Sequence, residues 1–267
     1  MIPAIAPRVL SLSPGTIVAA GPAATVDYAA DAGFTHVGLR FDPDEPADTV
    51  AKATNRLAAR NMTLFDVEVI RLGVTPTTHA HRLVNIAAEL GASWIVVTSH
   101  LPTPAETLRA LRDLVTRCEN ERPGLLLGFE AMGFTEVKTV YDAASLVREA
   151  GAGLIFDPLH MYRTGHGPVD AERVLGNGSL PCYLQLCDTL RPRVTAQPMG
   201  EDELIAEARH GRHLPGTGIL QLAEFVAAMP AHTSVTAEVQ SDVLYAELGP
   251  GELARRCFTT SQGVLRR

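Results

Sequence analysis

The chain has 267 residues, of which 46% are hydrophobic and 20% are charged, and its formal net charge is −7. This composition predicts a globular protein with a substantial core, and the length suits one large domain such as an α/β barrel. The acidic balance argues against broad binding to nucleic acid, whose phosphates attract a basic surface, and no apolar run approaches the about 18 residues that a membrane span needs.

Short β-prone segments alternate along the chain with segments of helical period or composition. Several of the helical segments end at a glycine or an asparagine, as helices commonly do, namely at Gly33, Asn61, Gly91 and Gly151. We expect strands at residues 8–13, 36–41, 63–70, 94–99, 124–130, 153–157, 182–188 and 234–239.

Eight strand–helix units with apolar strands predict a single-domain (β/α)8 TIM barrel over residues 1–267. An open doubly wound sheet is the alternative. It loses support because the segment SLSPGT at the first strand is not the glycine-rich phosphate loop of a dinucleotide-binding fold.

One connection, at about 188–218, is unusually long, and we expect it to form a lid-like loop. It contains a cluster of basic side chains, Arg191, Arg193, Arg209, Arg212 and His213.

The four cysteines include no CxxC pair, which predicts free thiols in a reducing compartment rather than a disulfide framework. The N-terminal segment also lacks the charged and apolar pattern of a signal peptide. We therefore expect a cytoplasmic protein.

Catalytic groups of a parallel barrel lie at the carboxyl ends of its strands. The fifth to eighth strands each carry an oxygen-bearing side chain near that end: Glu130, Asp157, Gln185 and Glu238. Three carboxylates packed closely would repel one another, and a divalent cation would remove the conflict. Such oxygen ligands suit a hard ion such as Mn²⁺ or Mg²⁺.

Other polar residues near the same ends are candidate substrate contacts. Glu68 in the third strand either serves the site or forms a buried salt bridge with Arg40 or Arg71, and His100 ends the fourth strand. His160 follows Asp157 by three residues and either contacts substrate or bonds to the backbone.

Five segments resemble the xylose isomerase-like TIM barrels of the sugar phosphate isomerase/epimerase family, in the AP endonuclease 2 superfamily: LGFE (127–130), FDPLHMYRTG (156–165), YLQLCD (183–188), EARHGRHLPGTG (207–218) and VTAEV (235–239). The resemblance spans most of the chain. It implies one divalent metal ion, with Mn²⁺ first and Mg²⁺, Co²⁺ or Zn²⁺ as alternatives, held by Glu130, Asp157, Gln185 and Glu238. The family usually has histidine, in an H-x-x-D pattern, where this chain has Gln185.

The resemblance further implies that Glu130, Glu238 and His160 are catalytic, with His160 binding a substrate oxygen or moving a proton. In this family the metal stabilises an enediolate formed from a hydroxy-ketone, so we expect an isomerase or epimerase of a sugar- or polyol-derived substrate. The likeness of the EAR segment makes Arg209 or Arg212 the expected arginine contact to substrate.

Two other functions remain open. A lyase that dehydrates a cyclic keto-polyol acid such as 3-dehydroshikimate is favoured by Gln185 and by the arginines of the long connection, which could hold a carboxylate. A non-catalytic ligand-binding module would explain the missing histidine. We expect a small-molecule substrate, which can be anionic, no nucleic-acid or membrane partner, and compatibility with a homo-oligomer.

Overall fold

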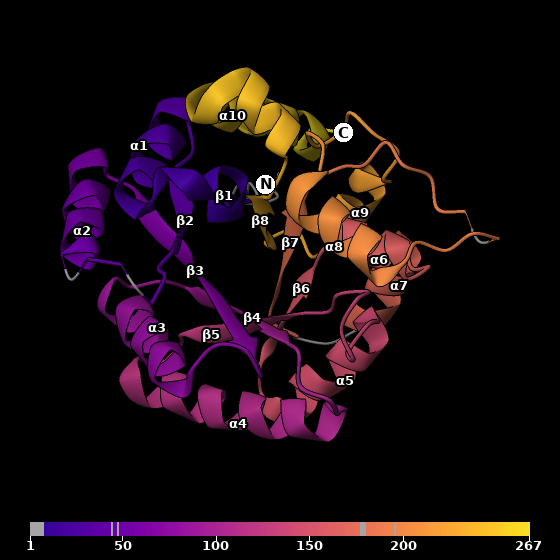
Figure 1. The fold of residues 1–267 in the computed structure, drawn as a ribbon, viewed down its shortest axis with the longest axis horizontal. Helices are drawn as coiled ribbons and strands as arrows, with labels where there is room; N and C mark the ends of the chain where they lie inside the picture. Colours follow the sequence, from indigo (N-terminus) through magenta and orange to yellow (C-terminus); the bar gives the residue numbers. More distant parts are fainter. Residues whose placement is uncertain (1–7, 44, 47, 177–179, 195) are drawn as a thin grey trace, which may run out of the picture.

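The computed structural model describes residues 8–267 except residues 44, 47, 177–179 and 195. Eight parallel strands close into a barrel in the order of the sequence, surrounded by helices (Figure 1). Because β1 also pairs with β8, the (β/α)8 barrel is confirmed and the open sheet is excluded. The strands are β1 (Leu10–Leu12), β2 (His36–Arg40), β3 (Thr63–Leu72), β4 (Trp94–Ser99), β5 (Leu126–Glu130), β6 (Gly153–Phe156), β7 (Cys182–Leu186) and β8 (Ser234–Ala237).

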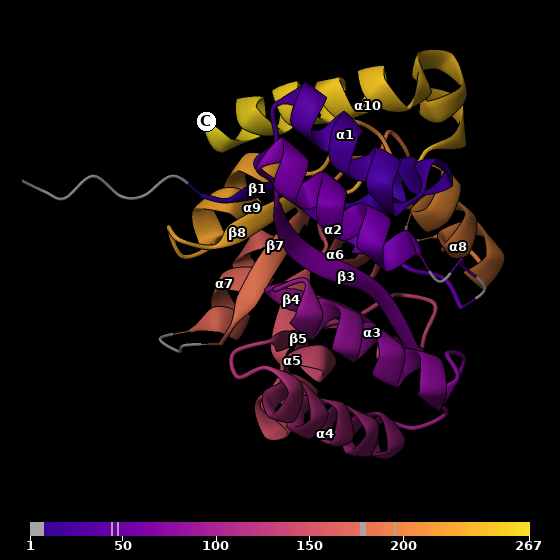
Figure 2. The ribbon, with the colours of Figure 1, turned by 90° about the vertical axis from the view of Figure 1, so that its left-hand side faces the viewer.

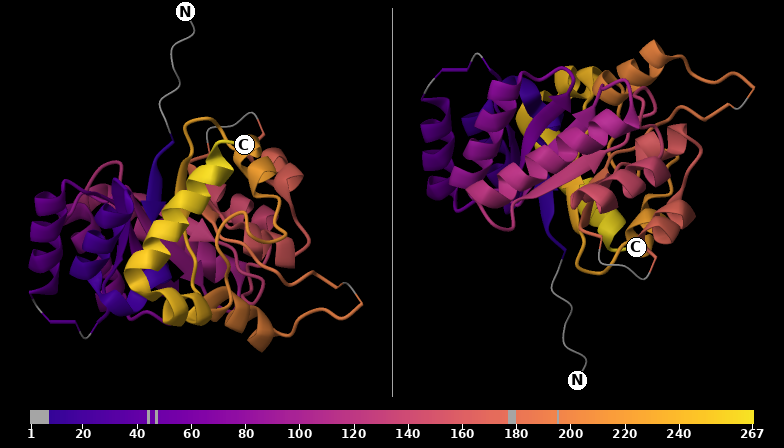
Figure 3. Two further views of the ribbon diagram at one scale, coloured as in Figure 1. Left: turned by 90° about the horizontal axis from the view of Figure 1, so that it is seen from above. Right: turned by 90° about the horizontal axis from the view of Figure 1, so that it is seen from below.

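The helices follow the strands and end largely where the sequence predicts. Gly33, Asn61 and Gly151 all adopt the left-handed conformation that ends a helix. The last helix, α10, closes the ring by packing against α1 (Figures 2 and 3). The helices are η1 (Pro14–Ala20), α1 (Pro22–Ala32), α2 (Thr49–Arg60), α3 (Thr77–Glu89), α4 (Pro104–Glu121), α5 (Val140–Ala150), α6 (Pro158–Arg163), α7 (Pro168–Leu175), α8 (Glu201–His210), α9 (Leu222–Ala228) and α10 (Asp242–Leu265).

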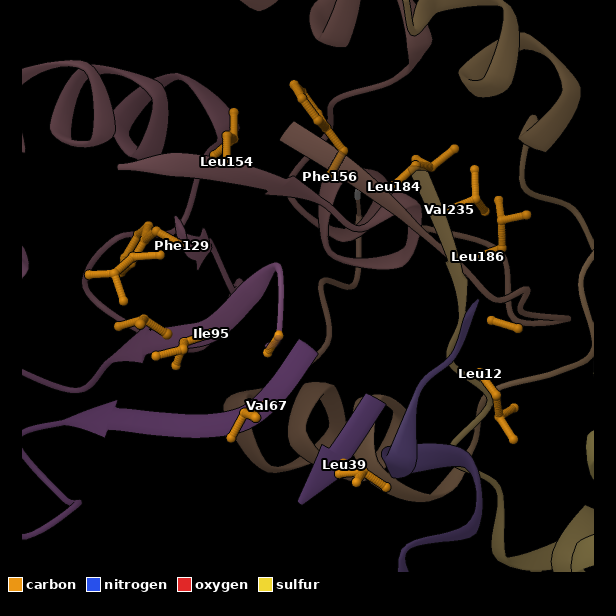
Figure 4. Close-up of a cluster of buried hydrophobic side chains, with 14 of the residues drawn as sticks. Leu12, Leu39, Val67, Ile95, Phe129, Leu154, Phe156, Leu184, Leu186 and Val235 are labelled. Carbon is orange, nitrogen blue, oxygen red and sulfur yellow. The ribbon is translucent and has the colours of Figure 1, made fainter. Parts of the chain in front are cut away.

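Alternate residues of the strands serve two separate cores. One set packs between the sheet and the helices, and Figure 4 shows members of it along the strands. The other set forms a plug that consists of Phe65, Trp94, Val96, Ile155 and Tyr183. The rings of Phe65 and Trp94 meet the Tyr183 ring edge-on with centroids 5.2 Å apart. This separate plug fills part of the barrel interior with apolar side chains. Polar side chains of the barrel interior lie near the carboxyl ends of the strands.

The connection at 188–218 is not simply a loop, because it contains helix α8. The three acidic residues that begin this helix suit its N-terminal dipole. Its residues Leu204, Ile205 and Ala208 lie at helical spacing and pack against Met132 and Phe134. The acidic start and the apolar spacing were both readable in the sequence. The lid-like movement of this segment stays a prediction.

The four cysteines are free thiols, as the sequence predicts: Cys118, Cys187 and Cys257 are buried and Cys182 is half-buried. Within the part of the chain that the structure describes, no helix has both the length and the apolar character needed to cross a membrane.

Candidate functional site

The strand order places the four expected metal ligands next to one another at one mouth of the barrel. Glu130 is the last residue of β5, Asp157 and Glu238 directly follow β6 and β8, and Gln185 lies in β7 between them. None of the four is more than 7% exposed. Glu130 and Glu238 line a cavity of about 740 Å³ that opens at this mouth.

Three of these side chains hold oxygens that are buried without a hydrogen-bond donor. Among the described residues, none donates a hydrogen bond to Glu130 Oε1, Gln185 Oε1 or Glu238 Oε2, and Glu238 Oε2 has only an ion-pair contact with Arg212 Nη1 at 3.3 Å. An oxygen removed from water and left without a partner costs free energy. The donor set therefore fits a group that binds oxygens, and a divalent cation is such a group.

Asp157 already has protein partners. Its Oδ1 accepts the backbone N–H groups of Leu159 and His160, at 2.7 and 3.3 Å, and so caps helix α6. Its Oδ2 accepts a hydrogen bond of 2.7 Å from Nη1 of Arg212. Asp157 is thus held rigidly at the mouth whether or not it also binds a cation.

Arg212 is a buried cation placed between two carboxylates. Its Nη1 lies 2.7 Å from Asp157 Oδ2 and 3.3 Å from Glu238 Oε2. Its Nε donates to the backbone oxygen of Ala208 at 2.8 Å, which fixes the guanidinium. The sequence predicts Arg212 as a substrate contact. It lines the cavity, but its charge faces the expected metal ligands.

Burial and mutual repulsion change the acidity of the cluster. Burial, with the charges of Glu238 and Asp157, raises the pKa of Glu130 well above its usual value. Burial raises the pKa of Glu238 to about 7. Burial opposes ionisation of Asp157 too, but Arg212 and His160 outweigh it and keep the pKa of Asp157 below its usual value. Without a cation, the site therefore favours protons on its two glutamates.

His160 lies on α6 beside Glu130, with its Nε2 3.6 Å from Glu130 Oε1. Burial lowers the pKa of His160 to about 4, so the ring is neutral at neutral pH. Its ring also meets the edge of Phe134. One ligand atom from each of Glu130, Asp157 and His160 lies within 4.8 Å of the others, and this buried group could hold a metal ion.

Glu68 forms the buried salt bridge that the sequence allowed as an alternative, and its partner is Arg40. The Glu68 Oε2 atom accepts from Arg40 at 2.7 Å, and Oε1 accepts from the Ser13 hydroxyl at 2.8 Å. Ser13 also lies 3.5 Å from Glu238 Oε1. Glu68 lines the cavity and is linked through Ser13 to an expected metal ligand.

The remaining predicted contacts, His100 and Arg209, both line the cavity. The site also includes residues that are not predicted above, Ser13, Arg40 and Arg71, of which the last two line the cavity. Applying the strand-end rule to the first three strands would have found them.

Asp188, the acidic residue after β7, has a structural role. It is fully buried and accepts four backbone N–H groups at 2.9 to 3.0 Å, from Thr189, Gly216, Gly218 and Leu220. This carboxylate fastens the PGTG segment to the end of β7. It thereby fixes the stretch of chain on which Arg212 lies.

A family model described as "Xylose isomerase-like TIM barrel" matches residues 26–255. No curated protein matches the chain. A solved xylose isomerase-like TIM barrel/4-hydroxyphenylpyruvate dioxygenase fusion protein is 20% identical with a TM-score of 0.75, and the match covers 96% of this chain but only 42% of the fusion protein.

Two further solved structures match along nearly their whole length. The IolI protein with a bound zinc atom is 15% identical with a TM-score of 0.74, covering 96% of this chain and 97% of that one. D-psicose 3-epimerase in the presence of D-fructose is 14% identical with a TM-score of 0.69, covering 96% of this chain and 99% of that one. At such identities these likenesses show the shared fold alone.

Proposed function

Because the chain belongs to the xylose isomerase-like TIM barrel family, we propose that it is a divalent-metal-dependent isomerase or epimerase. Its substrate would be a sugar- or polyol-derived hydroxy-ketone that reacts through an enediolate. The observation that carries this proposal is the set of buried oxygens of Glu130, Gln185 and Glu238 that accept no hydrogen bond from any described residue. A hard divalent cation is the partner that suits such a set.

We assign the ligands of one such ion as Glu130, Asp157, Gln185 and Glu238. When bound, the ion supplies Lewis-acid polarisation of a substrate carbonyl. Mn²⁺ is the first candidate, because four oxygen ligands suit Mn²⁺ or Mg²⁺ better than the nitrogen- and sulfur-seeking Zn²⁺. His160 is an alternative ligand, since its ring lies with Glu130 and Asp157 in one cluster.

The proton transfers of this reaction fall to Glu130 and Glu238. The two carboxylates reach the cavity from β5 and β8, with two strands between them. They can therefore meet a reacting carbon from different sides, one removing a proton and the other returning it. His160, neutral and buried at the cavity wall, would hold a substrate oxygen by a hydrogen bond.

A metal-dependent lyase is the second candidate. The same carboxylates would remove the proton, and loss of a β-hydroxyl would follow instead of reprotonation. Cationic side chains on the cavity wall favour it, because a cyclic keto-polyol acid carries a carboxylate for them to bind. A product with a new C=C bond, seen by its ultraviolet absorbance, identifies the lyase. Solvent deuterium in recovered substrate or product, without that absorbance, identifies the isomerase.

The first test is metal analysis of purified protein by plasma mass spectrometry. We expect about one equivalent of a divalent ion in the wild type and in a Glu149→Gln control, whose side chain is exposed on α5. Glu238→Gln and Asp157→Asn should lose most of it. A protein that neither contains nor takes up a divalent ion would overturn the proposal.

A further inference from the structure

Four arginines line the cavity, and they fall into two pairs. Arg40 and Arg212 are bound to the buried carboxylates of the site. The side chains of Arg71 and Arg209 form no ion pair or hydrogen bond with any residue that the structure describes. Their charges are therefore free to bind something in the cavity.

Arg71 comes from the far end of β3 and is half-buried. Burial lowers the pKa of Arg71, and the positive charges of Arg40 and Arg209 lower it further. The charges of Glu68 and Asp42 act in the other direction, but neither residue comes within ion-pair distance of Arg71. A partly desolvated guanidinium beside like charges is stabilised when an anion binds to it.

Arg209 is an exposed residue near the end of α8, and the packing of this helix places it at the cavity. The apolar residues of this helix pack on Met132 and Phe134, and its Glu207 binds Arg163. Ala208, Arg209, His210 and Arg212 then line the cavity wall. The charge of Arg209 is thus presented to the cavity by a fixed helix.

His100 is exposed at the end of β4 and lines the same cavity. Burial lowers the pKa of His100, and the charges of Arg209 and Arg71 lower it further, with Glu201 acting against them. All three basic groups line the same cavity. At neutral pH the His100 ring is uncharged and can donate a hydrogen bond to the anion that the two arginines bind.

We propose that Arg71, Arg209 and His100 form a subsite for an anionic oxyacid group of the substrate, a carboxylate or a phosphate. Guanidinium groups bind both kinds of anion through paired, charge-assisted hydrogen bonds. The subsite is separate from Arg212, whose charge is committed to Asp157 and Glu238. This inference rests on the proposed function in one respect: the substrate becomes a hydroxy-ketone or keto-polyol that carries a negative charge away from its reacting carbons.

The test is a calorimetric titration of chelator-treated protein with a ketopentose 5-phosphate, an aldonic acid and a neutral ketopentose. We expect at least one anionic probe to bind about tenfold or more tightly than the neutral sugar, because a hydrogen bond to a charged group contributes this much. Arg71→Gln and Arg209→Gln should each remove about a tenfold share of that binding. Arg71→Lys should recover part of the lost anion binding. Its thermal midpoint, compared with that of the wild type, shows whether a substitution at this position leaves the protein folded. Arg109→Gln, which removes an exposed positive charge on α4, should change nothing.

Equal binding of neutral and anionic probes, or binding that the Arg71 and Arg209 variants leave intact, would overturn the subsite. The phosphate and acid arms show which anion the subsite prefers. Because the metal is removed, the result does not depend on the metal site. If the protein prefers anionic probes but takes up no metal, only the proposed function is refuted. If it takes up metal but does not prefer anionic probes, only the subsite is refuted.

Discussion

Replacing Arg212 by methionine tests whether this arginine is the internal counter-ion of the carboxylate cluster. The change removes the bonds of 2.7 Å to Asp157 and 2.8 Å to the Ala208 carbonyl, and the ion pair of 3.3 Å to Glu238. Methionine fills a similar volume, so the main effect of the change is that the buried carboxyl groups of Asp157 and Glu238 lose their cation. Breaking a buried ion pair by removing one partner costs about 3 to 5 kcal/mol. We expect a loss of that size in the free energy of unfolding of chelator-treated Arg212→Met.

The assay is urea denaturation at pH 8, with chelator and then with saturating Mn²⁺. A ligand that binds only the folded state stabilises it in proportion to the logarithm of its affinity. Since the variant removes the positive charge that would repel a cation at Asp157 and Glu238, Mn²⁺ should stabilise it more than it stabilises the wild type. Arg109→Met is the matched control, because Arg109 is exposed, and it should stay within about 0.5 kcal/mol of the wild type.

A double-mutant cycle with Asp157→Asn separates the ion pair from the lost packing. We expect a coupling free energy between Arg212 and Asp157 above about 1 kcal/mol. An unfolding free energy of Arg212→Met within about 1 kcal/mol of the wild type, at an unchanged denaturant slope, would refute the reasoning.

Two other buried carboxyl groups give further predictions. Asp188→Asn leaves about half of the four backbone N–H groups that bind this side chain without an acceptor. We therefore expect urea denaturation to show a loss of about 3 kcal/mol in the free energy of unfolding. A loss below about 1 kcal/mol would mean that other contacts hold the PGTG segment. Burial, with the charges of Glu68 and Glu238, raises the pKa of Asp66 well above its usual value, so the folded protein keeps a proton that the unfolded chain loses above about pH 4. Wild-type stability should therefore fall relative to Asp66→Asn as the pH rises, by up to about 1.4 kcal/mol per pH unit, until the folded-state pKa is passed; urea midpoints that differ by a constant amount from pH 4 to pH 8 would contradict this.

The strands could be predicted from the sequence because their signal is local. Alternation between apolar strands and helical segments placed all eight, and no predicted strand end differs from the observed one by more than two residues. The missed helix α8 lies among polar residues, so its three apolar positions were outweighed by its charges. The order of the carboxylates followed from the barrel topology alone, which fixes which strand ends are neighbours.

The pairing of charged groups could not be predicted, because it depends on distances between segments far apart in the sequence. Arg212 is 55 residues from Asp157, and Ser13 is 55 residues from Glu68. Sequence reasoning could offer both Arg40 and Arg71 as partners for Glu68. Only the fold places Arg40 at 2.7 Å from Glu68 and leaves Arg71 without an ion pair among the residues that the structure describes.

The charges of the site suit a divalent cation despite the replacement of histidine by Gln185. Glutamine and neutral histidine carry the same charge, so the replacement changes a ligand atom and not the electrostatic balance. With Glu130, Asp157 and Glu238 ionised, Arg212 reduces a charge of minus three to minus two, which one divalent ion neutralises. The raised pKa values of the two glutamates mean that this ion must displace protons, as metals do at such ligands. Metal affinity should therefore rise with pH through neutrality. Arg71 and Arg209 take no part in this charge balance between Arg212, the carboxylates and the metal ion, so they remain to offset a charge on the substrate.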